Sequence, residues 1–145
     1  MAVVRDLLNR KGTDVVSIAP SASVLEAARL MNDRSVGGVV VVDEKGALLG
    51  IFTERDILRR VVAANLSPET TKVADVFTRD IVTTNPDMNV DECGAIMSTR
   101  RVRHLPVVDA GGLHGLVTIG DLLAHRVSEQ ETTIQHLNSY VFDMR

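Results

Sequence analysis

The sequence predicts a mixed α/β fold made of two similar halves that pack on each other through their sheets. Residues 15–43 align with residues 81–109, 66 positions further along the chain. After a one-residue gap, GIFTERDIL at 50–58 aligns with GLVTIGDLL at 115–123. Self-similarity at a fixed spacing is typical of an internal structural repeat. Each copy follows the order strand, helix, strand, strand, helix, so we expect two pseudo-symmetric β-α-β-β-α repeats.

The first strand and first helix of each copy are indicated by their boundaries. Short β-runs at Val15–Ile18 and Ile81–Thr84 each end near a proline. Ser23 and Asn89, residue types that cap helix N-termini, then open the helices. Apolar residues follow at helical spacing, which predicts one buried face in each copy. These faces consist of Val24, Ala27, Ala28 and Met31 in the first copy, and of Val90, Cys93, Ile96 and Met97 in the second.

A hairpin and a second helix complete each copy. Continuous apolar runs predict strands that are buried on both faces, and segments containing Asp and Gly predict the turns that follow them. The next strand passes directly into a helix at Thr53 or Thr118. The predicted strand, turn and strand are 39–42, 43–46 and 48–52 in the first copy, and 105–108, 109–112 and 113–117 in the second.

We expect two domains joined by a short linker. The first spans residues 1–64 and begins with a lead-in helix at Val4–Lys11, and residues 65–72 form the linker. The second spans residues 73–127 and begins with the corresponding short helix at Val73–Phe77. Half-domains of about 60 residues are marginally stable alone, so the two should pack on each other.

Residues 128–145 form a C-terminal tail with a helical pattern. Ile134, Leu137 and Val141 fall on one face of a helix predicted from Ser128 to Met144. We expect a helical tail that follows the second domain.

Composition and charge exclude several classes of function. The 145 residues are 45% hydrophobic and 24% charged, as in ordinary globular chains, while a net charge of -3 and 3% aromatic residues do not suit nucleic-acid binding. The single cysteine, Cys93, excludes an internal disulfide and favours a reducing compartment. The N-terminus lacks the apolar region of a signal peptide, and no apolar run approaches the ~18 residues of a membrane span. We therefore expect a cytoplasmic protein that binds neither nucleic acid nor membrane.

The repeats resemble a known family. GIFTERD at 50–56, GLVTIGD at 115–121 and RVRHLPVVD at 101–109 are similar to the motifs of cystathionine-β-synthase (CBS) domains. Two such copies in register resemble a tandem CBS pair, or Bateman module, and the resemblance covers residues 3–127. It is strongest to small stand-alone prokaryotic CBS-domain proteins. The resemblance implies two clefts between the domains, binding of an adenosyl ligand, a regulatory role and assembly as a homodimer.

Each copy carries a Thr-x-x-Asp segment where its last strand becomes a helix. Thr53 with Asp56, and Thr118 with Asp121, fit a helix-capping box with Asp in place of Glu. The same geometry fits a ligand, because a helix N-terminus attracts phosphate and a carboxylate accepts hydrogen bonds from ribose hydroxyls. In the family that the repeats resemble, the matching Asp contacts ribose and the matching Thr or Ser lies near phosphate. Both roles can coexist, and we expect ligand contact above all in the second copy.

Basic residues distinguish the two copies. Arg103 and His104 precede a strand of the second copy, at positions that face phosphate in related CBS sites, and arginine suits bidentate phosphate binding. The alternative is a solvated run of charge at a helix end. The first copy has Gly37 and Gly38 at these positions, with Arg55 as the candidate that supplies the missing charge. We therefore expect the two clefts to differ in ligand or in occupancy.

Four further positions are candidates for an adenine pocket. The resemblance implies that Ser17 and Thr83 line it through hydroxyl and backbone groups, and the alternative is that they are ordinary strand residues. Val36 and Val102 would cover the purine, or serve only the core.

These features favour an adenine-nucleotide sensor without enzymatic activity. AMP is the first choice and ADP, ATP or NAD are close behind, while S-adenosylmethionine fits less well because Arg103 and His104 favour a phosphate. Such a module would signal energy or redox state to a partner protein. The alternative is a structural dimerisation or interaction module with degenerate clefts. No nucleophile–base pair and no metal-ligand spacing stands out, so no catalytic cofactor or metal is expected.

Overall fold

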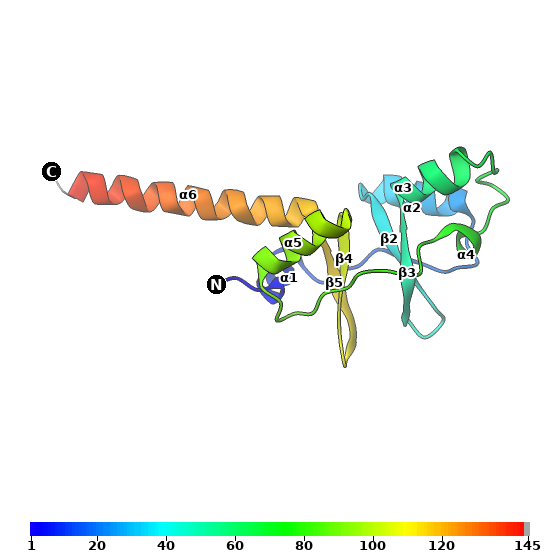
Figure 1. The fold of residues 1–145 in the computed structure, drawn as a ribbon, viewed down its shortest axis with the longest axis horizontal. Helices are drawn as coiled ribbons and strands as arrows, with labels where there is room; N and C mark the ends of the chain where they lie inside the picture. The colour runs from blue at the N-terminus through cyan, green and yellow to red at the C-terminus, as the bar shows by residue number, and fades with distance from the viewer. Residues whose placement is uncertain (144–145) are drawn as a thin grey trace.

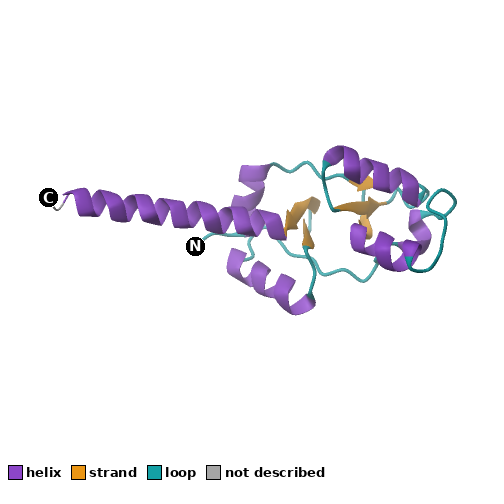
Figure 2. Ribbon diagram, turned by 90° about the horizontal axis from the view of Figure 1, so that it is seen from above, coloured by secondary structure: helices purple, strands orange, loops and turns teal. Residues whose placement is uncertain are grey.

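Two small β-sheets form the centre of the computed structural model, which describes the backbone of residues 1–143 and the side chains of residues 1–138. Both sheets lie in the middle of the body with the helices around them, and one long helix projects away (Figure 1; Figure 2). This arrangement confirms the predicted α/β class with two halves.

The first half follows the predicted order of elements. These are β1 (Ser17–Ile18), α2 (Val24–Arg34), β2 (Gly38–Val42), β3 (Leu48–Thr53) and α3 (Glu54–Asp56), which continues as the π-helical segment η1 (Ile57–Val62). β1 pairs with β2 in parallel, and β2 pairs with β3 antiparallel. Val39, Val40 and Val41 are fully buried, as the continuous apolar run predicts.

The second half repeats this order with one strand fewer. Its elements are α5 (Val90–Arg100), β4 (His104–Asp109), β5 (Gly112–Thr118) and α6 (Ile119–Asp143). β4 and β5 pair antiparallel, as β2 and β3 do. The two hairpins also shift register at corresponding places, after Val41 in one and after Val107 in the other.

The strand predicted at Ile81–Thr84 is wrong, because only Thr84 pairs with β4, in a single parallel bridge. In the first half the Val40 N–H donates to the Val16 carbonyl at 3.1 Å. The residue that corresponds to Val40 in the second half is Pro106, which has no N–H to donate. The pairing therefore cannot extend toward Ile81, and the edge of this sheet stays irregular.

The two lead-in helices pack on the opposite halves. α1 (Val4–Lys11) precedes the first repeat in sequence, yet its buried face joins the core of the second half. α4 (Val73–Val76) precedes the second repeat and joins the core of the first. The Val4 N–H donates to the Met88 carbonyl at 2.9 Å, and the corresponding Val73 N–H bonds the first half in the same way at 2.8 Å. The two halves are therefore intertwined, and a boundary near residue 64 divides the sequence rather than the packing.

Helix-capping predictions from the sequence are confirmed at α2 and α5. The Ser23 hydroxyl accepts the Glu26 N–H at 3.1 Å, and the Asn89 side-chain oxygen accepts the Asp91 N–H at 2.7 Å. Cys93 lies on the buried face of α5, where burial raises the pKa of its thiol to about 11. Its side chain therefore serves the core, as its helical position predicts.

The helix predicted from Ser128 is confirmed as far as Asp143, but it is the continuation of the helix that begins after Thr118, because α6 is one continuous helix of 25 residues. No glycine or proline interrupts the sequence between Asp121 and Asp143, and nothing therefore ends the helix near residue 128. Met144, the predicted end of the tail helix, lies outside the described residues. The C-terminal part of α6 extends beyond the body (Figure 1). No described helix, α6 included, combines the length and the hydropathy needed to cross a membrane.

Candidate ligand-binding clefts

Two clefts lie between the halves, each beside one Thr-x-x-Asp segment. The Asp56 cleft, lined by Thr53 and Asp56 among others, has a volume of about 520 Å³. The Thr118 cleft, lined by Thr118 and Gly120 among others, has a volume of about 360 Å³. Each receives residues from both repeats, so a molecule bound in either one would touch both halves.

Asp56 is held at the floor of its cleft by a complete capping box at the start of α3. Its Oδ2 accepts the Thr53 N–H at 3.0 Å, and its own N–H donates to the Thr53 hydroxyl oxygen at 3.4 Å. Its Oδ1 accepts the Thr78 hydroxyl at 2.9 Å and lies 3.8 Å from Arg60 Nε. The residue is only 8% exposed, so both oxygens are fixed in position.

Asp121 caps α6 with the same geometry but has a different partner on its far side. Its Oδ2 accepts the Thr118 N–H at 2.8 Å and also the ammonium of Lys11 at 2.8 Å. Lys11 donates a second bond, to the Leu116 carbonyl, at 2.8 Å. Lys11 lines the Thr118 cleft, whereas Asp121, its ion-pair partner, does not. Among the described residues, Oδ1 of Asp121 has no hydrogen-bond partner.

Each cleft combines the helix start of one repeat with the approach segment of the other. Ile81 and Val82, which precede the second repeat's first helix, line the Asp56 cleft. The corresponding Val15 and Val16 line the Thr118 cleft. Apolar surface therefore lies across from polar, helix-terminal atoms in both clefts. Such a combination suits a ligand with one flat apolar part and one polar part.

The clefts differ in charge, and the more basic one is the Asp56 cleft. The first repeat has glycines where the second has Arg103 and His104, but the cleft is formed by both repeats together. Arginines from α3 and η1 of the first repeat line this cleft together with arginines that follow α5 in the second repeat. They are Arg55, Arg59, Arg60, Arg101 and Arg103. The acidic residues of the same cleft are Glu54, Asp56 and Asp80, so its arginines outnumber its carboxylates. The Thr118 cleft has two cationic residues, Lys11 and Arg103, and two acidic ones, Asp14 and Glu54.

His104 lies between the two clefts and lines both. It packs against β2, because a Cβ added to Gly38 would lie 3.1 Å from His104 Nε2. Burial lowers the pKa of the imidazole, and the nearby Glu54 carboxylate acts in the opposite direction. The ring is therefore mainly neutral at neutral pH and joins the two halves by close packing.

Most residues proposed from the sequence lie on one of the clefts. Those on the Asp56 cleft are Gly37, Thr53, Arg55, Asp56, Val102, Arg103 and His104. Those on the Thr118 cleft are Val36, Gly37, Gly38, Arg103, His104 and Thr118. Asp121 lines neither cleft. Ser17 and Thr83 are exposed and also line neither. Their neighbours Val16 and Val82 face the clefts instead, because successive side chains of an extended chain alternate in direction.

Sequence reasoning missed several lining residues. Asp14 and Asp80 each line a cleft and lie 66 positions apart, so the register of the repeat could have revealed them. Thr78 and Lys11 carried no such signal. Both reach a motif aspartate through the exchange of segments between halves, which no local pattern predicts.

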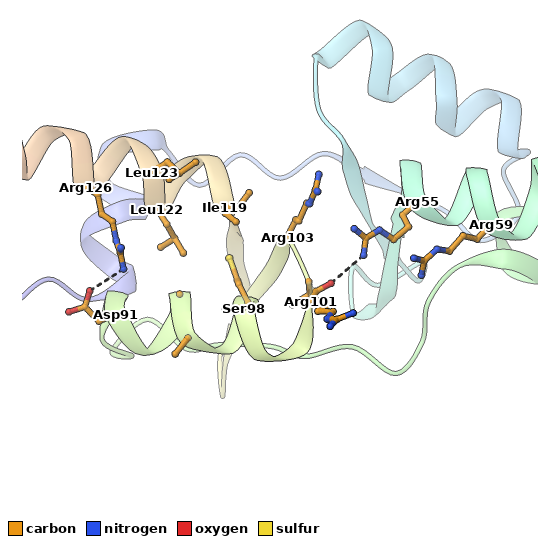
Figure 3. Close-up of a pocket in the computed structure, with 14 residues that line it drawn as sticks. Arg55, Arg59, Asp91, Ser98, Arg101, Arg103, Ile119, Leu122, Leu123 and Arg126 are labelled. Atoms are coloured by element: carbon orange, nitrogen blue, oxygen red, sulfur yellow. Dashed lines mark hydrogen bonds and ion pairs between the residues drawn. The ribbon is translucent and has the colours of Figure 1, made fainter.

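A third depression, the outer groove, runs between η1 and helices α5 and α6 and has a volume of about 810 Å³. Arg55, Arg59, Arg101 and Arg103 line both this groove and the Asp56 cleft, so the two are continuous. Arg55 reaches across to the Arg101 carbonyl at 3.4 Å (Figure 3). The Asp56 cleft thus opens outward along a row of guanidinium groups. Within residues 1–138, no group of three or more His, Cys, Asp or Glu side chains is arranged to hold a metal ion.

Comparisons with known proteins agree with this architecture. The family model described as CBS domain matches residues 4–63 and again residues 73–128. The CBS domain-containing protein YhcV of Bacillus subtilis is 34% identical over 143 residues, which cover 95% of this chain and 99% of that protein. The crystal structure of a CBS-domain containing protein from Agrobacterium tumefaciens has a TM-score of 0.81 and 39% identity, covering 86% of this chain and 92% of the other.

A third similar structure contains ligands. It is the CBS domain pair of protein MJ0100 in complex with 5′-methylthioadenosine and S-adenosyl-L-methionine. Its TM-score is 0.79 with 27% identity, covering 89% of this chain and 98% of that one.

Proposed function

This chain belongs to the CBS domain family as a tandem pair of CBS domains, and on that premise we propose that it binds a phosphorylated adenosine, AMP in the first place, in its Asp56 cleft. The observation that carries the proposal is the meeting of five arginines with a buried, capped aspartate in one cleft between the halves. CBS pairs are regulatory modules, and we assign this chain a regulatory rather than catalytic role.

The ribose would bind at Asp56. Oδ1 faces Thr78 rather than the helix, and a ribose hydroxyl can donate to this oxygen while Oδ2 keeps its bond to the Thr53 N–H. A carboxylate has about four acceptor positions, so capping and ribose binding are compatible. The capping box then serves to fix the direction of the carboxylate before the ligand arrives.

The phosphate would bind among the arginines. Guanidinium groups match phosphate oxygens bidentately and stay charged at any physiological pH. Arg55, at the start of α3, and Arg103, before β4, approach the cleft from different repeats. The continuation of the arginines into the outer groove leaves room for further phosphates, so ADP, ATP and NAD fit the same orientation.

The purine would lie against the apolar side of the cleft. Ile81 and Val82 come from one segment and Val102 from another, and together they offer aliphatic cover across from Asp56. Low aromatic content, 3% of the chain, favours this kind of cover over ring stacking. The Thr118 cleft, with Lys11 on its aspartate, is the second candidate site and is weaker for a phosphate.

Binding between the halves also supplies a means of regulation. A ligand that touches both repeats favours the arrangement in which both contacts are made, and so changes the surface that a partner protein meets. MJ0100 is in complex with two adenosyl compounds that lack a phosphate, and the arginines of this chain are the feature that favours a phosphorylated ligand here.

Thermal unfolding with a ligand panel tests the proposal. AMP, ADP, ATP, NAD and S-adenosylmethionine are each added at about 100 times their dissociation constant. At this concentration a ligand that binds only the folded state raises the free energy of unfolding by about 2.7 kcal/mol. We expect AMP to raise the Tm by several degrees, and Asp56→Asn to remove the shift. Absence of a shift with every ligand overturns nucleotide binding and leaves the structural interaction module. A shift with S-adenosylmethionine alone overturns the assignment of the phosphate.

A further inference from the structure

Helix α6 has an exposed apolar face that runs along both its halves and that the body of the protein does not cover. The match to the family ends at residue 128, but the helix continues to residue 143 (Figure 1). Leu123, Val127, Ile134 and Leu137 are 58%, 52%, 56% and 59% exposed. An isolated helix of about 15 residues is marginal in water, so an apolar face of this kind needs a partner to stay helical.

The spacing of these residues is that of a coiled coil. Val127 and Ile134 are seven residues apart and occupy the first position of a heptad, and Leu123 and Leu137 occupy the fourth position two heptads apart. Gln130 takes the fourth position between them. β-Branched residues at the first position with leucine at the fourth favour two parallel strands over higher assemblies.

We propose that α6 pairs with α6 of a second copy of this chain as a parallel, two-stranded coiled coil. Charge complementarity supports this occupant. In a parallel pair, the seventh position of one heptad faces the fifth position of the next heptad on the partner helix, five residues further along. Arg126 and Glu131 occupy these positions, so each dimer brings together two pairs of opposite charge.

The contacts that these two residues make within one chain leave them available. Arg126 lies 4.0 Å from Asp91, and the side chains are 62% and 81% exposed, so this ion pair is weak (Figure 3). Glu131 is exposed. In an antiparallel pair, by contrast, fifth positions face fifth positions, and Arg126 would not meet Glu131.

The coiled-coil seam, formed by Leu123, Val127, Ile134 and Leu137, begins next to the body of the protein. Leu123 lines the outer groove together with Ile119 and Leu122 (Figure 3). A partner helix in register therefore covers the outer wall of the groove as well as the free part of α6. Helix α6 carries the seam along its length and Asp121 in its first turn. Dimerisation and the Thr118 cleft therefore share one rigid element.

Disulfide cross-linking of the full-length chain tests the pairing and its direction. In a parallel, in-register pair identical seam positions face each other, so Ile134→Cys and Leu137→Cys each form a covalent dimer under mild oxidation. Gln135→Cys, an equally exposed neighbour off the seam, is the matched control and stays monomeric on a non-reducing gel. Cys93 is buried and is replaced by Ser in every variant.

Sedimentation equilibrium supplies a second measurement that does not depend on cysteines. Leu137→Glu lies on an exposed surface, leaves the thermal unfolding of the monomer unchanged, and weakens the dimer by about 100-fold or more. Arg126→Glu weakens it about tenfold, and adding Glu131→Arg restores it. A Leu137→Glu variant that dimerises as tightly as the unmodified chain, or Ile134→Cys and Leu137→Cys variants that cross-link no better than Gln135→Cys, overturns the parallel pair. A chain that is monomeric without mutation overturns it as well.

Discussion

The two motif aspartates begin their helices in the same way and differ in what reaches them from the opposite half. Asp56 faces the hydroxyl of Thr78, while Asp121 carries the ammonium of Lys11. Both partners come from segments that were exchanged between halves. The shared Thr-x-x-Asp motif therefore gives both halves the same capping box. The chemistry of each cleft is determined by the segment that packs on the opposite half.

The same contrast appears in charge. The repeat without basic residues before its second strand forms the more basic cleft, because η1 supplies Arg59 and Arg60, with Arg55 just before it, and the other repeat supplies Arg101 and Arg103. A comparison of the two copies position by position would assign phosphate binding to the second copy. The packing instead favours phosphate binding in the Asp56 cleft, beside the motif of the first copy.

The largest difference between the halves is expected in the stability lost when each of two matching glycines, Gly50 and Gly115, is replaced by alanine. A Cβ on Gly50 would lie far inside van der Waals distance of the Thr78 carbonyl oxygen, which is backbone and cannot move away. A Cβ on Gly115 would lie 2.7 Å from Leu8 Cδ2, the end of a flexible side chain. We predict that Gly50→Ala costs about 3 kcal/mol or more in the free energy of unfolding, and that Gly115→Ala costs about 1 kcal/mol. Urea unfolding of both variants measures this, and equal losses would contradict it.

Nucleotide affinity should separate the two sets of cationic residues. Arg55→Met removes a guanidinium from the Asp56 cleft, and Lys11→Met removes the ammonium of the Thr118 cleft. A hydrogen bond to a charged group contributes about 1.5–3 kcal/mol. We therefore expect Arg55→Met to weaken AMP binding about 10- to 100-fold and Lys11→Met to leave it nearly unchanged. The reverse order in a binding titration would place the phosphate in the Thr118 cleft.

A smaller effect is expected on stability at the bond that joins α1 to α6. Lys11 and Asp121 are 31% and 21% exposed, whereas Arg5 and Asp87 form an ion pair at 55% and 77% exposure. Exposed pairs contribute about 0–1 kcal/mol, and the more covered pair should lie at the upper end. We predict a loss of about 1 kcal/mol for Lys11→Met and no measurable loss for Arg5→Met. If chemical denaturation gives the same loss of stability for both variants, the lower exposure of the Lys11–Asp121 pair adds nothing to its strength.

The smallest expected effect is a dependence of stability on pH at the contact between the halves. Because the pKa of His104 is lowered in the folded protein from an ordinary value of 6.5, the unfolded chain binds the proton more readily. The contribution of neutral His104 is present above pH 6.5 and is lost as the pH falls through the lowered value. His104→Asn should flatten this slope between neutral and mildly acidic pH. A slope that does not change would assign the titration to other groups.

Much of the fold follows from local patterns in the sequence. Ser23 and Asn89 cap their helices as their residue types predict, and the valine-rich strand β2 is buried on both faces. The strand predicted at 81–84 was wrong because Pro106, whose effect is non-local, removes the donor that would extend the pairing. The exchange of α1 and α4 was beyond prediction from periodicity, since an amphipathic helix does not specify which of two similar sheets it covers.

The candidate site was predictable to the extent that it depends on helix starts. Thr53, Asp56 and Thr118 lie on the clefts because strand-to-helix junctions always expose N–H groups at one end. Ser17 and Thr83 lie outside them because a shift of one residue in an extended segment reverses the side chain's direction. Contacts such as Thr78 with Asp56 depend on packing between segments 22 residues apart and had no local signature.

Isothermal titration calorimetry of AMP with the unmodified chain, Asp56→Asn and Asp121→Asn tests most directly where the nucleotide binds. Asparagine can still accept the capping bond but lacks the charge and the second acceptor oxygen, so each variant should fold. Binding that is lost in Asp56→Asn and kept in Asp121→Asn is the predicted result. Binding that is kept in Asp56→Asn, or an unmodified chain that does not bind AMP, would contradict the assignment of the Asp56 cleft.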